Sequence, residues 1–131
     1  MQRNKFGKQF YSLVGGGVDA GETGEQALHR EVGEESSLQI ANPRLVIIQE
    51  NQTFGQQLIY LADYVSGEPA LAPGSEEAAN TKAGQNTYQP LWVPIDQLGD
   101  VPLWPDELKQ CLLQCLSTGF PEQPQTLKLP E

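Results

Sequence analysis

The stretch that decides the fold is a glycine-rich loop followed by an acidic helix, GGGVDAGETGEQALHREVGEESSL, residues 15–38. Three consecutive glycines allow backbone angles and close approaches that a side chain would forbid, so this loop is suited to backbone contact with a ligand. Thr23 followed three residues later by Gln26 forms a capping-box pattern. The sequence therefore predicts a helix over residues 24–35.

The predicted helix carries three carboxylates on one face. Glu31, Glu34 and Glu35 stand three and four residues apart, whereas Leu28 and Val32 fall to the other side. Like charges at this spacing repel each other, and a bound cation removes that cost. Mg²⁺ prefers hard oxygen ligands and completes its shell with water and phosphate oxygens. The alternative is a solvated acidic face, the commoner reason for a Glu-Glu pair.

Length and composition indicate one domain spanning residues 1–131, with a net charge of −9. That charge repels a nucleic-acid polymer but not a small phosphorylated substrate whose charge a cation neutralises. No apolar run is long enough to span a membrane, and the N-terminus does not read as a signal peptide. We therefore expect a cytoplasmic protein without a membrane partner. Cys111 and Cys115 lie on an apolar helical stripe and are expected to be core thiols.

The rest of the chain alternates predicted strands and helices. Residues 1–7 are polar and basic, and residues 9–14 favour a strand. Two further strands, 45–49 and 56–65, follow a turn at Asn42 and Pro43 and are joined by a turn at Phe54 and Gly55. An irregular region over 66–86 contains one helical turn at 76–80. A strand at 88–93, a helix from Asp106 to about residue 117 and an extended tail over 120–131 complete an α/β sandwich with a mixed sheet.

The spacing within residues 16–38 resembles the Nudix box, the signature of the Nudix hydrolase family. The pattern is a glycine, five residues, a glutamate, seven residues, Arg-Glu, an aliphatic residue, any residue, Glu-Glu, any residue, a glycine and an aliphatic residue. Ser37 replaces the second glycine. The matching positions are Gly16, Glu22, Arg30, Glu31, Val32, Glu34, Glu35 and Leu38. So many fixed positions make the resemblance specific.

The resemblance implies a Nudix-like α/β/α sandwich with a mixed sheet, in a chain that lacks the usual N-terminal strand or strands. It also implies metal and catalytic roles. Mg²⁺ or Mn²⁺ would be bound by the carboxylates of Glu31, Glu34 and Glu35 and by the Gly16 carbonyl. Catalysis would depend on Glu31, Glu34, Arg30 and Glu22, the last as a supporting acid paired with Arg30. We expect Gly16, Gly17, Glu76 and Glu77 to contact the substrate, and the two later glutamates are also candidates for the general base.

The function implied is hydrolysis of a pyrophosphate bond in a nucleoside diphosphate-linked small molecule, by metal-assisted attack of water. The alternative is a non-catalytic Nudix-like module that binds nucleotides or another protein. A late start would leave a sheet edge exposed, and such edges are commonly covered by pairing with another chain. We therefore predict a homodimer, with strand exchange as one form of it.

Overall fold

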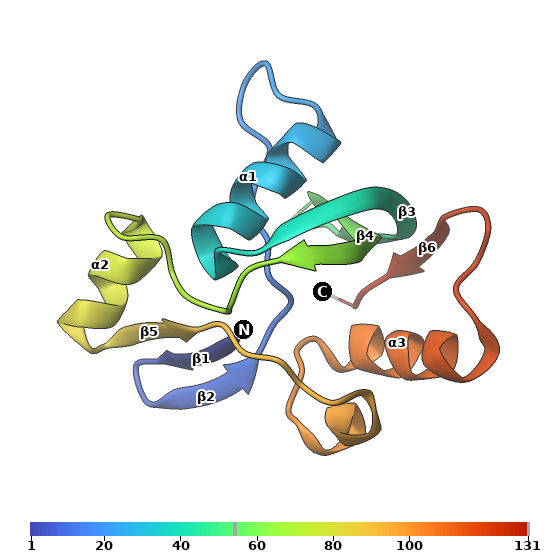
Figure 1. Cartoon of the computed structure of the whole chain (residues 1–131). Coiled ribbons are helices and arrows are strands. Elements are labelled where there is room, and N and C mark those ends of the chain that lie inside the picture. Colours follow the sequence, from blue (N-terminus) through green and yellow to red (C-terminus); the bar gives the residue numbers. More distant parts are fainter. Residues whose placement is uncertain (54, 131) are drawn as a thin grey trace.

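The structure is a computed structural model that describes residues 1–53 and 55–130. Phe54, at one of the expected turns, lies outside the described residues. Two small sheets and three α-helices make up the fold (Figure 1). In chain order the elements are β1 Gln2–Lys5, β2 Lys8–Tyr11, α1 Gly24–Ser36, β3 Gln39–Asn51, β4 Gly55–Ser66, α2 Glu76–Ala83, β5 Asn86–Gln89, the 3-10 helix η1 Ile95–Asp100, α3 Asp106–Thr118 and β6 Gln125–Lys128.

The first sheet has the order β2-β1-β5 and is antiparallel throughout. No strand was expected over residues 1–7, and that expectation was wrong, because residues 2–5 form β1. Phe6 and Gly7 both have positive φ angles, 51° and 86°, and turn the chain back so that β1 pairs with β2. Polar β1 lies in the middle because all four of its residues pair with both β2 and β5, and the Arg3 guanidinium adds a contact 3.6 Å from the centre of the Tyr88 ring on β5.

The second sheet has the order β4-β3-β6 and is mixed, because β3 pairs antiparallel with β4 and parallel with β6. The predicted mixed α/β fold is thereby confirmed. Two details were wrong. Asn42 and Pro43 lie within β3, where the register to β4 shifts and Asn42 takes a φ of 52°. The tail is not merely extended, since residues 125–128 form β6 and Leu127 packs against the core.

The apolar core joins the second sheet to α3. Val46 and Ile47 of β3 and Leu108 of α3 are almost fully buried and form one cluster. Figure 1 shows α1 above this sheet and α3 below it. Cys115 is buried and Cys111 packs against the cluster, and both are free thiols, as expected. Among the described helices, none has the length and apolar character needed to cross a membrane.

The helix ends follow local chemistry. The capping box of α1 is confirmed, since Thr23 N donates to Gln26 Oε1 at 2.9 Å and Gln26 N donates to Thr23 Oγ1 at 3.1 Å. The predicted turn at 76–80 is a longer helix, α2, capped by Ser75. The helix expected from Asp106 is α3, which begins at that residue, and Pro105 takes the N-cap position. The strand expected over 88–93 ends at Gln89, because Pro90 has no amide hydrogen to donate.

Candidate active site

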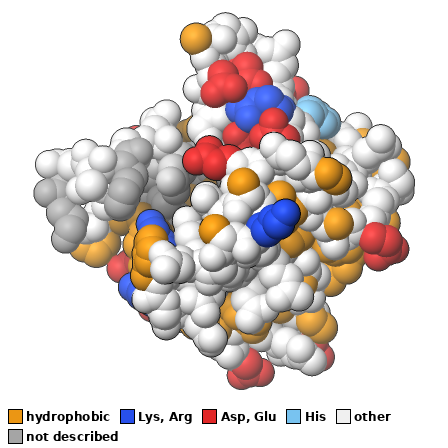
Figure 2. Space-filling model, turned by 90° about the vertical axis from the view of Figure 1, so that its left-hand side faces the viewer, with side chains coloured by type: hydrophobic (Ala, Val, Ile, Leu, Met, Phe, Trp, Pro, Cys, Tyr) orange, Lys and Arg blue, Asp and Glu red, His pale blue; other side chains and the backbone are white. Residues whose placement is uncertain are grey.

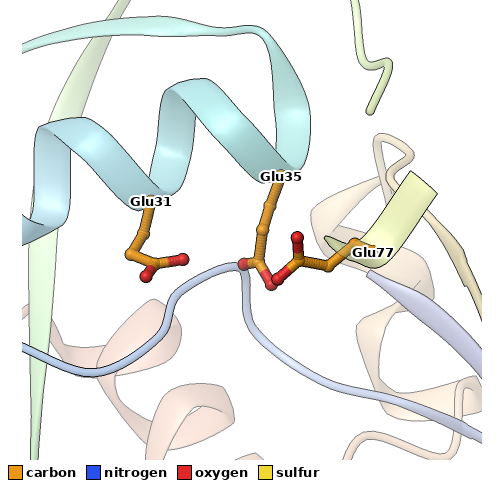
Figure 3. A group of neighbouring side chains, drawn as sticks. All are labelled: Glu31, Glu35 and Glu77. Atoms are coloured by element: carbon orange, nitrogen blue, oxygen red, sulfur yellow. The ribbon is translucent and has the colours of Figure 1, made fainter. Parts of the chain in front are cut away.

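Three carboxylates from two helices meet at one point. Glu31 and Glu35 lie one turn apart on α1, and Glu77 lies in the first turn of α2. One carboxylate oxygen from each residue lies within 4.8 Å of the other two. Figure 3 shows Glu31 and Glu35 pointing from α1 toward the loop that precedes it, with Glu77 reaching across from α2. Folding thus brings together acidic groups from two helices that β3 and β4 separate in the sequence.

Glu35 sits in the least favourable electrostatic position of the three. Its side chain is buried, with a residue exposure of 6%. Burial is the main cause that raises its pKa, to about 7, and the negative charges of Glu31 and Glu77 raise it further. The Gly15 amide, which donates to Glu35 Oε2 at 2.6 Å, and the Met1 amino group act in the opposite direction. A proton or a cation therefore stabilises this cluster near neutral pH.

Gly16 lies against the carboxylate of Glu31. A Cβ at position 16 would overlap the carboxylate group of Glu31, so that this side chain would have to move. The neighbouring Gly17 has open space where its Cβ would be. Only the first of these two glycines is needed for close approach, and it brings the loop backbone directly to the carboxylate cluster.

Arg30 ties the acidic residues of the loop and helix together. Its Nε donates to Glu22 Oε2 at 2.8 Å and its Nη2 to Glu22 Oε1 at 3.0 Å, a bidentate pair. Its Nη1 donates to Glu31 Oε1 at 2.7 Å, and Nη2 also donates to the Gly17 carbonyl at 3.0 Å. Figure 2 shows acidic side chains gathered around a basic one at the top of this face. The pairing raises the pKa of Arg30 and lowers that of Glu22.

The predicted site residues divide into three groups. Glu31, Glu35 and Glu77 converge, and Gly16 lies against Glu31. Glu34 is set apart, because its side chain is 45% exposed and its nearest ion pair is with Arg30 Nη1 at 3.4 Å. Arg30 forms an ion pair with Glu22 beside the cluster and also donates to the Gly17 carbonyl. Glu76 is the first residue of α2 and is not part of the converging group.

The sequence named Glu77 only as a candidate for substrate contact or general base. Its place beside Glu31 and Glu35 makes it equally a candidate metal ligand. A Ser75 cap and an acidic pair at the start of a helix were the only local signals. The donor set fits a hard divalent cation, since all three groups are carboxylates and their mutual repulsion is relieved by positive charge.

A comparison of the chain with family models gives a match to the NUDIX domain over residues 1–114. The chain belongs to the Nudix family. The resemblance drawn from residues 16–38 is thereby confirmed, and the match extends well beyond that segment into α3.

Curated relatives share parts of this chain. An NAD-capped RNA hydrolase NudC from Mannheimia succiniciproducens is 40% identical over 80 residues, which are 60% of this chain and 29% of that protein. An oxidized purine nucleoside triphosphate hydrolase from Danio rerio is 32% identical over 114 residues, which are 82% of this chain and 64% of that protein. This Nudix chain thus spans less than two thirds of the length of these relatives.

The fold has a solved counterpart. The structure of an ADP-ribose pyrophosphatase from Streptococcus suis superposes with a TM-score of 0.60 and 19% sequence identity, covering 98% of this chain and 88% of the other. At that identity the likeness speaks for the fold alone. It agrees with the mixed sheet and flanking helices seen here.

Proposed function

We propose that this Nudix protein is a divalent-metal-dependent hydrolase that cleaves a pyrophosphate bond in a nucleoside diphosphate-linked small molecule. The observation that carries the proposal is the convergence of Glu31, Glu35 and Glu77 beside a glycine loop. A solvated acidic face, the alternative interpretation of the sequence, needs no such convergence from separate helices. It also does not need Glu35 to be buried with a pKa raised to about 7.

The three converging carboxylates and the Gly16 carbonyl would hold Mg²⁺ or Mn²⁺. When bound, such an ion neutralises pyrophosphate charge and lowers the pKa of a coordinated water. The protein's own part is orientation. Arg30 fixes the carboxylate of Glu31 and is itself fixed by the bidentate contact with Glu22. The Gly15 amide fixes Glu35.

Glu34 suits the role of proton acceptor. It is the most exposed of the three box glutamates in this helix and is held only by a 3.4 Å contact to Arg30. In the proposed step, the water oxygen forms a bond to phosphorus, the bond from phosphorus to the bridging oxygen breaks, and the water proton passes to a carboxylate. Glu77 is the alternative acceptor, because it too is only partly buried.

A separate cavity offers room for the nucleoside. It has a volume of about 430 Å³ and lies between the ends of β3 and β4 and the start of α3, with Gln57, Trp104 and Glu107 in its lining. Gln49 also lines it, is only 5% exposed, and its Oε1 is a buried acceptor without a partner in the described part of the chain. A carboxamide acceptor beside an indole suits a flat ring that donates hydrogen bonds, such as a nucleobase.

Residues 11–15 contact one residue that lines the cavity and one residue of the carboxylate cluster. Trp104 N donates to the Tyr11 carbonyl at 2.8 Å, and four residues later Gly15 N donates to Glu35 at 2.6 Å. Four extended residues span at most about 14 Å. A nucleotide could therefore place its base in the cavity and its phosphates at the carboxylates.

The relatives guide the choice of substrates. Their names point to NAD-capped RNA, oxidized purine nucleoside triphosphates and ADP-ribose as the substrates of those proteins. For this chain we propose a small nucleotide and not a polymer, because its net charge of −9 opposes a polyanion. A cytoplasmic location and a homodimer remain predictions from the sequence.

A chromatographic screen tests the proposal against the non-catalytic module. Nucleoside triphosphates, oxidized purine triphosphates, ADP-ribose and NAD would be incubated with the protein and Mg²⁺, with Glu35→Gln as the matched inactive variant. Turnover of at least one compound by the wild type, and not by the variant, is expected. Binding of nucleotides without turnover by folded protein would favour the module.

A further inference from the structure

Ser37 occupies the position at which the family pattern has glycine, and its hydroxyl forms a hydrogen bond that glycine could not form. The residue ends α1 in the left-handed conformation, with φ 61° and ψ 16°, which favours glycine. Its Oγ donates to the carbonyl of Ala70 at 2.7 Å. A glycine here would make the easier helix cap and could not form this hydrogen bond. The serine therefore has a less favourable backbone conformation than glycine would have, but it forms a hydrogen bond to a loop that is distant in the sequence.

The loop that Ser37 contacts runs along the C-terminal end of α1. Ala70 N donates to the Ser36 carbonyl at 2.9 Å, and Ala72 N donates to the Glu34 carbonyl at 2.8 Å. Gly67 packs so tightly that a Cβ there would lie 2.5 Å from the Ser37 carbonyl oxygen. These contacts bind residues 67–72, which we call the tether loop, to carbonyls that α1 leaves unsatisfied at its end.

The tether loop continues directly into α2. Ser75 N donates to the Ala72 carbonyl at 3.2 Å, and Ser75 Oγ accepts from Ala78 N at 3.0 Å as the cap of that helix. Glu77 lies inside this capped turn, and its carboxylate meets those of Glu31 and Glu35. A series of hydrogen bonds thus leads from the end of α1 to the first turn of α2, where Glu77 lies.

We propose that Ser37 is a positioning residue that holds Glu77 at the metal site by fixing the tether loop through Ala70. The inference rests on the proposed function, because it assumes that Glu77 helps to hold the cation. Ser37 is exposed and touches none of the three carboxylates in the described structure, so it acts only through the loop. The carboxylate of Glu77 lies within 4.8 Å of two others of like charge, and the hydroxyl contact opposes a displacement of α2 away from them.

Two variants separate positioning from stability. Ser37→Gly removes the hydroxyl and relieves the left-handed backbone, whereas Ser37→Ala removes the hydroxyl and keeps the backbone strain. Ser66→Ala is the matched control, because its hydroxyl contacts Gln39 and not the tether loop. The melting temperature should be lower for the alanine variant than for the glycine variant. Both should bind Mn²⁺ roughly threefold more weakly than wild type by calorimetry, as expected for loss of one modest hydrogen bond.

Amide hydrogen exchange measures how firmly the tether loop is held in the metal-free protein. The Ala70 and Ala72 amides should exchange roughly three- to tenfold faster in both Ser37 variants and unchanged in Ser66→Ala. Unchanged exchange at both amides would overturn the proposal, because the hydroxyl would not be fixing the loop.

A double-mutant cycle shows whether Ser37 acts through Glu77. In a Glu77→Gln background, Ser37→Gly should no longer weaken Mn²⁺ binding. An equal weakening in both backgrounds would overturn the role of Ser37 while leaving the proposed function intact. Wild-type protein that binds no Mn²⁺ would refute both. Mn²⁺ binding with the expected cycle, but no turnover of any nucleotide, would refute only the hydrolase.

Discussion

Glu77 of α2 and Glu35 of α1 present carboxylate oxygens within 4.8 Å of each other, although β3 and β4 separate them in the chain. Two like charges this close, one of them buried, form an arrangement that folding alone does not favour. A third carboxylate, Glu31, lies beside them, and the proposed cation would relieve the repulsion among all three. The relationship also makes Glu77 of α2 a candidate ligand of a metal site whose expected ligands all lay in α1 and the loop before it.

Replacing Glu77 by glutamine should weaken Mn²⁺ binding roughly tenfold or more, because one of three negative donors is lost. Titration calorimetry measures this directly. Glu76→Gln is the matched control, since Glu76 precedes it on the same helix but lies outside the converging group. Equal losses in the two variants would show that the overall negative charge of α2 matters and not the position of Glu77.

Gly16→Ala should reduce kcat by roughly tenfold or more while leaving the protein folded. The new Cβ would meet Glu31 Cδ at 2.4 Å and force the carboxylate out of the cluster. Gly17→Ala, where the Cβ has open space, should retain activity within about twofold, because the change touches no neighbour. Steady-state kinetics and a melting curve compare the pair. Similar activity of the two variants would mean that Glu31 need not stay where the structure has it.

The stability of the metal-free protein should fall as pH rises from about 5 to about 7. Glu35 has a folded pKa raised from 4.5 to about 7, so the folded state holds its proton more tightly than the unfolded chain does. The resulting stabilisation, at most about 3 kcal/mol, is complete below pH 4.5 and is lost through pH 7. Glu22 has a lowered pKa, so its contribution is lost only as pH falls below its ordinary value of 4.5.

Thermal melts in the presence of a chelator, at several pH values, test this dependence. Glu35→Gln should flatten the decline between pH 5 and pH 7, because glutamine has no proton to lose. A decline of unchanged slope in that variant would assign the effect to another group.

Gln49→Leu should raise KM for the nucleotide roughly tenfold and leave kcat nearly unchanged. The Gln49 carboxamide lines the cavity proposed for the nucleoside and is not part of the carboxylate cluster, so its loss should weaken binding in the ground and transition states alike. Gln39→Leu is the control, because it lies at the opposite end of the same strand β3. A fall in kcat at constant KM would place Gln49 at the reacting bond instead.

The sequence predicted the parts of the site that depend on local spacing. The Thr23 and Gln26 capping box set the start of α1, and a helix then necessarily places Glu31 and Glu35 one turn apart. The Arg30 contact with Glu22 also follows from one short loop and one helix turn. Each of these features can be predicted from a few consecutive residues.

The sequence did not predict features that depend on contacts between residues far apart in the chain, or predicted them only in part. The residues of β1, Gln-Arg-Asn-Lys, have no apolar alternation, and they form a strand because β2 and β5 flank them. Residues 125–128 become a strand only by meeting β3. Glu77 reaches the cluster because the tether loop returns to α1, and a contact over that distance leaves no periodic signal in the chain.

The most direct test of the central claim is ³¹P NMR of nucleotide reactions in water enriched with ¹⁸O. We expect that the wild type, with Mg²⁺, breaks a pyrophosphate bond and leaves ¹⁸O on a phosphorus atom of one product. Removal of the metal by a chelator should stop the reaction. Intact diphosphate linkages across the whole nucleotide panel, with folded protein and bound Mg²⁺, would contradict it.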